Sequence, residues 1–197
     1  MRNQLGFLIV VTAACTSSAP GGSNPGGGSN GSGTTFTPGD TISAVVTMSD
    51  GAGGSTSEAW IVLGSTSGLC ADATASPPID RKNQKLVTIQ LTDVNGSARA
   101  APTVAGTYTI YPDSGSEPAK SASLTTATLD GTCQPIDADA AQGQSGTVTL
   151  SAVSGGVFKG SYDVTLNTGA HVTGTFSPTA CPQLATAVTS NATPACM

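Results

Sequence analysis

The chain has few charged residues. Asp, Glu, Lys and Arg make up 10% of its 197 residues, against roughly 25% in an average soluble protein. The formal net charge is -5 at pH 7. Basic residues gather only at Arg81, Lys82 and Lys85, which we interpret as a solvated loop. Because a surface with a net negative charge repels the phosphate backbone of nucleic acids, we expect no nucleic-acid partner.

The sequence also lacks a long apolar run. Residues 5–11 are apolar apart from Gly6, and no later segment is longer and equally apolar. A helix that spans a bilayer needs about 20 predominantly apolar residues. A permanent transmembrane anchor is therefore not expected.

Residues of common catalytic sites are scarce. His171 is the only histidine, and no serine lies in a G-x-S-x-G motif, so a serine hydrolase with a histidine base is not expected. The glycine clusters precede neither a helix nor a Lys-Ser or Lys-Thr pair, which excludes a phosphate-binding loop. We predict no catalytic residue and no cofactor.

Metal-binding patterns are missing as well. The cysteines show no CxxC spacing, which argues against a zinc site. Asp137 and Asp139 could contribute oxygens to a calcium ion, but their segment lacks the glycine and the terminal glutamate of the calcium-loop pattern. The sequence favours a plain acidic loop and no metal.

Carboxylates leave one kind of chemistry open. A glycosidase uses a pair of Asp or Glu residues, and Glu58, Asp93, Asp130 and Asp163 are candidates. None of them has a diagnostic setting. Strand alternation places Asp163 on the solvent face of its predicted strand.

The first 35 residues differ from the rest of the chain. Arg2, the apolar residues 5–11 and the small residues before Cys15 have the layout of a secretory signal. Ala13, Ala14 and Cys15 directly after the apolar run resemble the lipobox of bacterial lipoprotein precursors. That resemblance implies a signal peptide over residues 1–14 and a diacylglyceryl group on the thiol of Cys15. The alternative is an ordinary signal peptide, with Cys15 incidental.

Residues 16–35 contain no apolar side chain larger than Ala or Pro and cannot contribute to a core. We therefore interpret residues 15–35 as the lipidated cysteine and a flexible tether, with a root-mean-square span on the order of 25 Å. The lipoprotein resemblance places the chain in the bacterial cell envelope. In that family Thr16 after the cysteine, rather than Asp, implies the outer membrane. The expected partners are the membrane, through the lipid on Cys15, and an unknown envelope or extracellular molecule.

Residues 36–197 are expected to form one all-β domain. Short alternating segments rich in Val, Ile, Thr, Tyr and Phe are separated by Gly, Pro, Asp and Ser clusters, and no stretch has convincing helical periodicity. Such a pattern predicts an antiparallel β-sandwich or a small β-barrel and does not decide between them. The predicted strands, about eight in number, are residues 41–48, 58–64, 85–92, 106–111, 121–129, 146–153, 157–167 and 171–177.

The sequence predicts the arrangement of two parts of this domain in more detail. The last three strands alternate apolar and polar residues and are joined by Gly-containing turns, which predicts an antiparallel meander. Residues 50–54 turn the first strand back into the second. The second strand contains the apolar run 60–63, typical of a strand buried on both faces, with Trp60 as a core anchor.

Four of the five cysteines remain for this domain: Cys70, Cys133, Cys181 and Cys196. An even set in an oxidising compartment predicts disulfides, and three pairings are possible. We favour Cys70 with Cys133, because both follow strands, and Cys181 with Cys196, because that bond would hold the tail after the last strand.

These observations favour a non-enzymatic, membrane-anchored binding or structural module. We expect its contacts on an exposed sheet face or on the long loops 65–83 and 134–145, which the favoured disulfide would bring together. One alternative is a hydrolase of envelope or extracellular polysaccharide or peptide. Another is an envelope assembly protein whose partner completes an exposed sheet edge.

The lipoprotein interpretation predicts the mass of the protein isolated from bacterial membranes. The mature chain should begin at Cys15 and carry added acyl mass. The other four of its five cysteines should react with an alkylating reagent only after reduction. Intact mass spectrometry with and without reduction measures both properties. An unlipidated chain, or thiols that alkylate without reduction, would contradict the prediction.

Overall fold

The computed structural model describes residues 34–49 and 54–197. The predicted signal peptide (1–14), Cys15, the predicted tether up to residue 33 and most of the predicted turn 50–54 lie outside the described residues. Residues 34 and 35, predicted as the end of the tether, form strand β1 (Thr34–Thr35).

All eight predicted strands are present, which confirms the all-β class. Their bounds differ from the prediction by a few residues. In chain order they are β2 (Asp40–Ser49), β3 (Ser55–Gly64), β5 (Lys85–Asn95), β7 (Gly106–Ile110), β8 (Lys120–Thr128), β9 (Ala141–Ser154), β10 (Val157–Leu166) and β11 (His171–Phe176).

Two short helices, which the sequence did not indicate, accompany the strands. Helix α1 (Leu69–Thr74) has 6 residues and α2 (Gln183–Thr189) has 7, and each is too short to show a 3.6-residue pattern in the sequence. None of the helices in the described residues is long and apolar enough to cross a membrane. The remaining short elements are β4 (Ile79–Asp80), β6 (Ala98–Ala100), the 3₁₀ turn η1 (Asp137–Asp139), β12 (Thr179–Ala180) and β13 (Ala195–Cys196).

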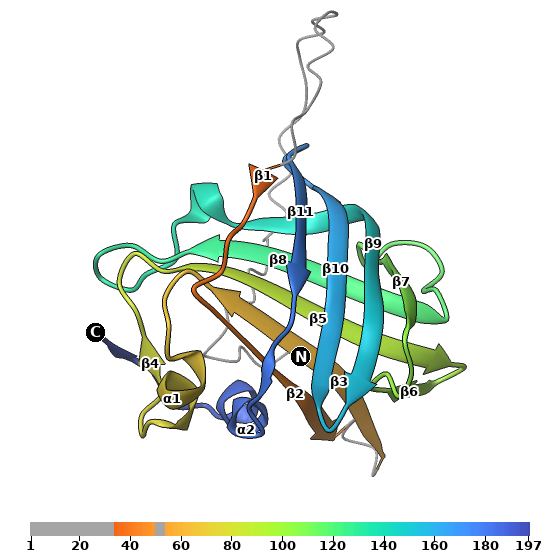
Figure 1. Cartoon of the computed structure of the whole chain (residues 1–197), viewed down its shortest axis with the longest axis horizontal. Coiled ribbons are helices and arrows are strands. Elements are labelled where there is room, and N and C mark those ends of the chain that lie inside the picture. The colour runs from red at the N-terminus through yellow and green to blue at the C-terminus, as the bar shows by residue number, and fades with distance from the viewer. Residues whose placement is uncertain (1–33, 50–53) are drawn as a thin grey trace, which may run out of the picture.

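The main sheet is mixed and curls into a half-barrel. Its strand order is β1-β11-β10-β9-β7-β8-β5-β3-β2-β12, with β6 paired to β5. The meander β9-β10-β11 is antiparallel as predicted, whereas β7–β8, β1–β11 and β12–β2 are parallel. Figure 1 shows the meander crossing in front of β2, β3, β5 and β8. The hydroxyl of Ser43 on β2 donates to the carbonyl of Gly156 in the β9–β10 turn at 2.8 Å.

Apolar side chains from both halves of the curled sheet fill the space between them. Strand alternation sends every second residue inward, and Ile61, Ile89, Tyr108, Val148 and Phe158 are each at most 1% exposed. They belong to one continuous core cluster. The interior of the half-barrel is therefore a packed core.

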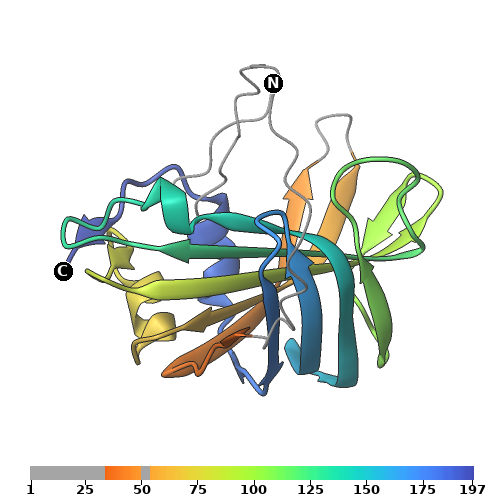
Figure 2. The same cartoon turned by 90° about the horizontal axis from the view of Figure 1, so that it is seen from above.

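A second apolar layer lies on the other face of β2 and β3. Val46, Trp60 and Val62 point outward from these strands and pack against Leu69 of α1 and Leu184 of α2. Both helices cover this face at one side of the molecule, close to the C-terminal end (Figure 2). The prediction that β3 is buried on both faces, with Trp60 as an anchor, is confirmed.

The prediction of two disulfides is confirmed, but the favoured pairing was wrong. Cys70 of α1 binds Cys181, which lies two residues before α2. Cys133, in the loop after β8, binds Cys196 of β13. The reason is spatial: α1 packs beside α2, and β13 returns to pair with β4.

Two glycines in the meander lie under aromatic rings of the neighbouring strand. Gly160 pairs with Phe176, and Gly174 pairs with Tyr162. A Cβ atom on Gly160 would lie 2.0 Å from the carbonyl oxygen of Thr149 and 3.0 Å from the ring of Phe176. The strands can approach this closely only because neither glycine has a side chain.

We expect Gly160→Ala to lower the free energy of unfolding by about 1–3 kcal/mol, because the methyl group forces backbone and ring to move. Urea denaturation measures the change. Gly131→Ala is the matched control, since its Cβ would have no atom within 4 Å, and it should leave stability nearly unchanged. Equal stability of the two variants would contradict this account of the meander.

Candidate functional site

His171 and Asp163 form an exposed pair on the outer face of the meander. His171 Nε2 lies 2.7 Å from Asp163 Oδ1, and the Asp163 side chain is 72% exposed, which confirms its predicted solvent position. In the described part of the chain no serine or threonine hydroxyl lies within hydrogen-bond distance of this imidazole. The pair is therefore an exposed hydrogen-bonded pair of small energetic value rather than an assembled nucleophile and base.

Asp93 belongs to a structural network at the ends of β5, β7 and β8. Its Oδ1 accepts hydrogen bonds from Tyr108 Oη at 2.9 Å and Lys120 Nζ at 3.0 Å. Burial, together with the bond to Asp93, raises the pKa of Tyr108 to about 12. Tyr108 is therefore a neutral donor at physiological pH, and the network holds three strands together.

The other carboxylates proposed from the sequence each have surroundings of their own. Burial raises the pKa of Glu58, opposed by the neighbouring Trp60 indole and Arg99. Asp130 accepts the backbone N–H groups of Gln134 and Thr132, and these bonds lower its pKa. No hydrogen bond joins any two of the four candidates in the described residues.

The acidic segment predicted over Asp137 and Asp139 forms η1, with both side chains exposed. Within residues 34–49 and 54–197, no group of three or more His, Cys, Asp or Glu side chains is placed to hold a metal ion.

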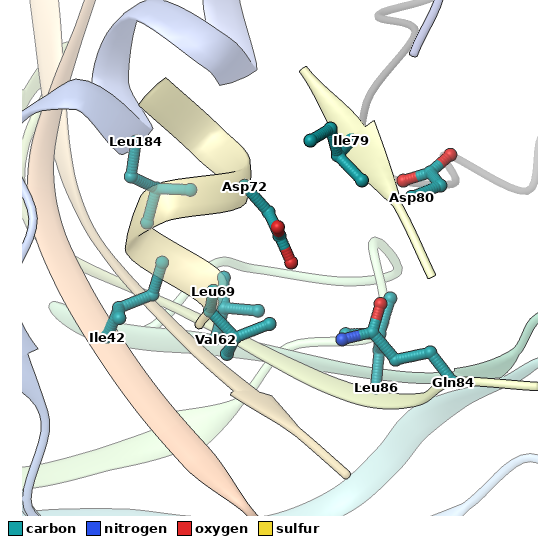
Figure 3. A pocket seen from close by; sticks show the side chains of 9 residues that line it. All are labelled: Ile42, Val62, Leu69, Asp72, Ile79, Asp80, Gln84, Leu86 and Leu184. Carbon is teal, nitrogen blue, oxygen red and sulfur yellow. The ribbon is translucent and has the colours of Figure 1, made fainter. Parts of the chain in front are cut away.

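A small pocket lies where α1, β4 and α2 meet the outer face of the sheet. Its volume of about 20 Å³ is room for about one water molecule and excludes an organic ligand. Most of its wall is apolar, and three polar side chains enter it (Figure 3). The lining residues are Ile42, Val62, Leu69, Asp72, Ile79, Asp80, Gln84, Leu86 and Leu184.

The two carboxylates of this pocket differ in their partners. Asp72 is buried and accepts two hydrogen bonds from Arg81, from Nε at 2.9 Å and from Nη2 at 2.6 Å. Burial and the nearby charge of Asp72 raise the pKa of Asp80 to about 6. Asp80 is therefore the group of the pocket that changes its charge near neutral pH.

Sequence reasoning missed this pocket. Asp72 and Asp80 lie inside the loop 65–83 that was predicted as a recognition element, but no spacing in the sequence identifies them. The favoured disulfide does not bring this loop to 134–145. The C-terminal segment connects them instead, because Cys196 pairs with Asp80 of β4 and is bonded to Cys133.

The outer face of β7, β9, β10 and β11 carries hydroxyl groups in two rows. Each row crosses four strands in register, because alternate residues of every strand point outward. All of these residues are exposed or partly exposed. One row is Thr107, Thr149, Ser161 and Thr175, and the other is Thr109, Thr147, Asp163 and Thr173. We call these eight residues the hydroxyl face.

No family model matches this chain, and no curated protein or solved structure matches it. The candidate sites are therefore the exposed His171–Asp163 pair, the pocket with Asp72 and Asp80, and the hydroxyl face that surrounds the first of them.

The raised pKa of Asp80 predicts how stability depends on pH. The folded-state pKa of about 6 lies above the unfolded value of about 3.9, so the folded chain binds this proton more strongly. The stability that the protonated Asp80 carboxyl contributes is fully present below about pH 4 and is lost as the pH rises through 6.

Asp80→Asn should therefore raise Tm by about 2–4 °C at about pH 7.5 and by nearly nothing at about pH 4. Calorimetry of both proteins across this range measures the difference. Asp139→Asn changes an exposed carboxylate and should show no such dependence. An unchanged or lower Tm for Asp80→Asn near neutral pH would contradict the prediction.

Proposed function

We propose that the chain is a lipid-anchored, non-enzymatic binding module of the bacterial cell envelope. In this proposal residues 1–14 direct secretion, Cys15 carries the lipid, and the tether presents the β domain at the membrane surface. The observation that carries the binding role is the hydroxyl face, with its two rows in register across β7, β9, β10 and β11.

The chemistry of the hydroxyl face fits a neutral partner with many hydroxyl groups. Seven of its eight residues are Thr or Ser, and each hydroxyl both donates and accepts hydrogen bonds. The one acidic member, Asp163, is paired with His171. We therefore propose a polysaccharide of the envelope or the extracellular medium as the ligand class.

The spacing of the rows suits a repeating polymer. Neighbouring strands lie about 4.8 Å apart, and alternate residues of one strand lie about 6.7 Å apart, so the hydroxyl groups repeat in two directions. The β-branched threonine side chain has few rotamers. Little side-chain entropy is therefore lost when these groups bind a ligand.

The state of the ionisable groups supports a role without catalysis. Asp72 is paired with Arg81, and Asp93 holds Tyr108 and Lys120 in place. Tyr108, with a pKa of about 12, is not an activated nucleophile. The interior of the half-barrel, where related architectures hold a ligand, is filled by side chains.

A second role, in envelope assembly, is favoured by the free edge of β2. Strand β12 pairs only with Ile42 and Ser43, so residues 44–48 have no strand beside them on that side in the described part of the chain. These five residues carry no charge, and Val45 is 41% exposed. An added strand from a partner could complete this edge.

The hydroxyl face can be tested by blocking its centre. Thr149 faces both Thr107 and Ser161 across the strands, so Thr149→Lys places a long charged chain among the hydroxyl groups. We expect at least about tenfold weaker binding to polysaccharide from the producing bacterium, measured by co-sedimentation.

Thr168→Lys, in the exposed β10–β11 turn, makes the same chemical change away from the face and should bind as the unchanged protein does. Thermal unfolding of both variants verifies that they are folded. Equal binding by the two variants would remove the hydroxyl face as the recognition surface.

A further inference from the structure

Both native disulfides join cysteines that are not successive in the chain. Cys70 is bonded to Cys181 over a separation of 111 residues, and Cys133 is bonded to Cys196 over 63. The two loops interleave, because Cys133 lies inside the first loop and Cys181 lies inside the second. Cys70 therefore has no native partner until the chain has been made as far as Cys181.

The unfolded chain favours a different first bond. The entropy lost when two residues are brought together increases with the logarithm of the length of the loop between them. Cys181 and Cys196 are 15 residues apart. They therefore meet about 20 times as often as Cys70 and Cys181 do across 111 residues. Once the bond between Cys181 and Cys196 has formed, Cys70 and Cys133 can pair only with each other.

The order in which the cysteines meet an oxidant favours the same two non-native bonds. A chain secreted from its N-terminus exposes Cys70 and Cys133 before the other two cysteines, and an oxidising compartment joins thiols that meet. The order of exposure rests on the proposed secretion, whereas the effect of loop length does not. Both effects produce a chain in which none of the four thiols of the domain is left to correct the pairing.

The folded domain protects its disulfides from later exchange. The N–H of Cys181 donates to the carbonyl of Ser43 on β2 at 2.8 Å, and Cys196 pairs with Asp80 of β4. Cys181 is 0% exposed and Cys133 is 6% exposed. A thiolate must reach a sulfur atom in order to exchange a disulfide. Non-native bonds must therefore be corrected before the domain closes over these two cysteines.

We propose that this chain is a substrate of a thiol–disulfide isomerase in the compartment where it folds. The enzyme converts the bonds Cys181–Cys196 and Cys70–Cys133 into the native pairs. Its point of attack is the sulfur of Cys196, which is exposed even in the folded domain. The partner is thus an enzyme with a reactive thiolate, and it is needed during folding rather than afterwards.

The exchange itself is neutral in electrons. The thiolate of the enzyme attacks Cys196, forms a mixed disulfide and releases the thiolate of Cys181. The Cys181 thiolate attacks Cys70, which forms the first native bond and releases Cys133. The Cys133 thiolate attacks Cys196, which forms the second native bond and returns the thiolate of the enzyme. The disulfide oxidant of the compartment has already accepted two electrons and two protons for each bond.

Oxidative refolding of the full chain with Cys15→Ser tests the proposal, because only the four cysteines of the domain can then pair. The reduced, unfolded chain is placed in reduced and oxidised glutathione, with or without protein disulfide isomerase. Alkylation at successive times and mass spectrometry without reduction identify the bonds. We expect Cys181–Cys196 to form first, and the native bonds to appear only after the thiols have been consumed. Isomerase should shorten this delay at least about tenfold.

The matched control carries Cys70→Ser and Cys181→Ser as well. Only Cys133 and Cys196 remain, so a single pairing is possible. Its bond should form as fast as its thiols are lost, with no delay for isomerase to shorten. The bond can be mapped whether or not this variant folds.

Two results would overturn the proposal. One is that both native bonds of the four-cysteine chain form as fast as its thiols are lost, without isomerase. The other is a delay that isomerase leaves unchanged. Neither measurement involves the lipid anchor or a polysaccharide, so this proposal and the proposed function fail separately.

Discussion

The burial of strand β3 on both faces is the constraint on which the rest of the fold depends. Ala59, Ile61 and Leu63 fill the half-barrel, while Trp60 and Val62 point the other way. Because neither face of β3 can be left to water, the sheet must curl over one face and the helices must cover the other. The position of α1 and α2, and with it the pocket beside them, follows from this strand.

The two helices are themselves too short to be stable alone. Helix α1 begins after Gly68, which has a φ of 91°, and neither helix has a side-chain cap of its own. Asp40 of β2 accepts the N–H groups of Gly68 and Leu69, both at 3.0 Å. The Cys70–Cys181 disulfide joins the helical layer covalently. Contacts between residues far apart in the sequence thus stabilise these helices in place of the local signals that longer helices have.

The difference between local sequence signals and contacts far apart in the sequence explains which features could be predicted. Strand positions and the outward side of Asp163 follow from a two-residue alternation that is visible within each short segment of the sequence. Both could therefore be predicted. The partners of Cys70 and Cys133 depend on α1 packing against α2 and on β13 returning to β4, which no local pattern encodes. Asp80 and Gln84 line one pocket together with residues of α1, α2 and the sheet, an arrangement that no local pattern encodes. The hydroxyl rows could not be predicted, because identifying them requires the register of four strands.

The pairing of β1 with β11 has a mechanical consequence. Only two residue pairs, Thr34 with Val172 and Thr35 with Thr173, hold this parallel contact. Tension on the N-terminal segment enters the domain through this contact, at the edge strand beside the hydroxyl face. Under such tension the two pairs would separate first, and Phe36, which packs against the core, would bear the load next, while both disulfides stay intact.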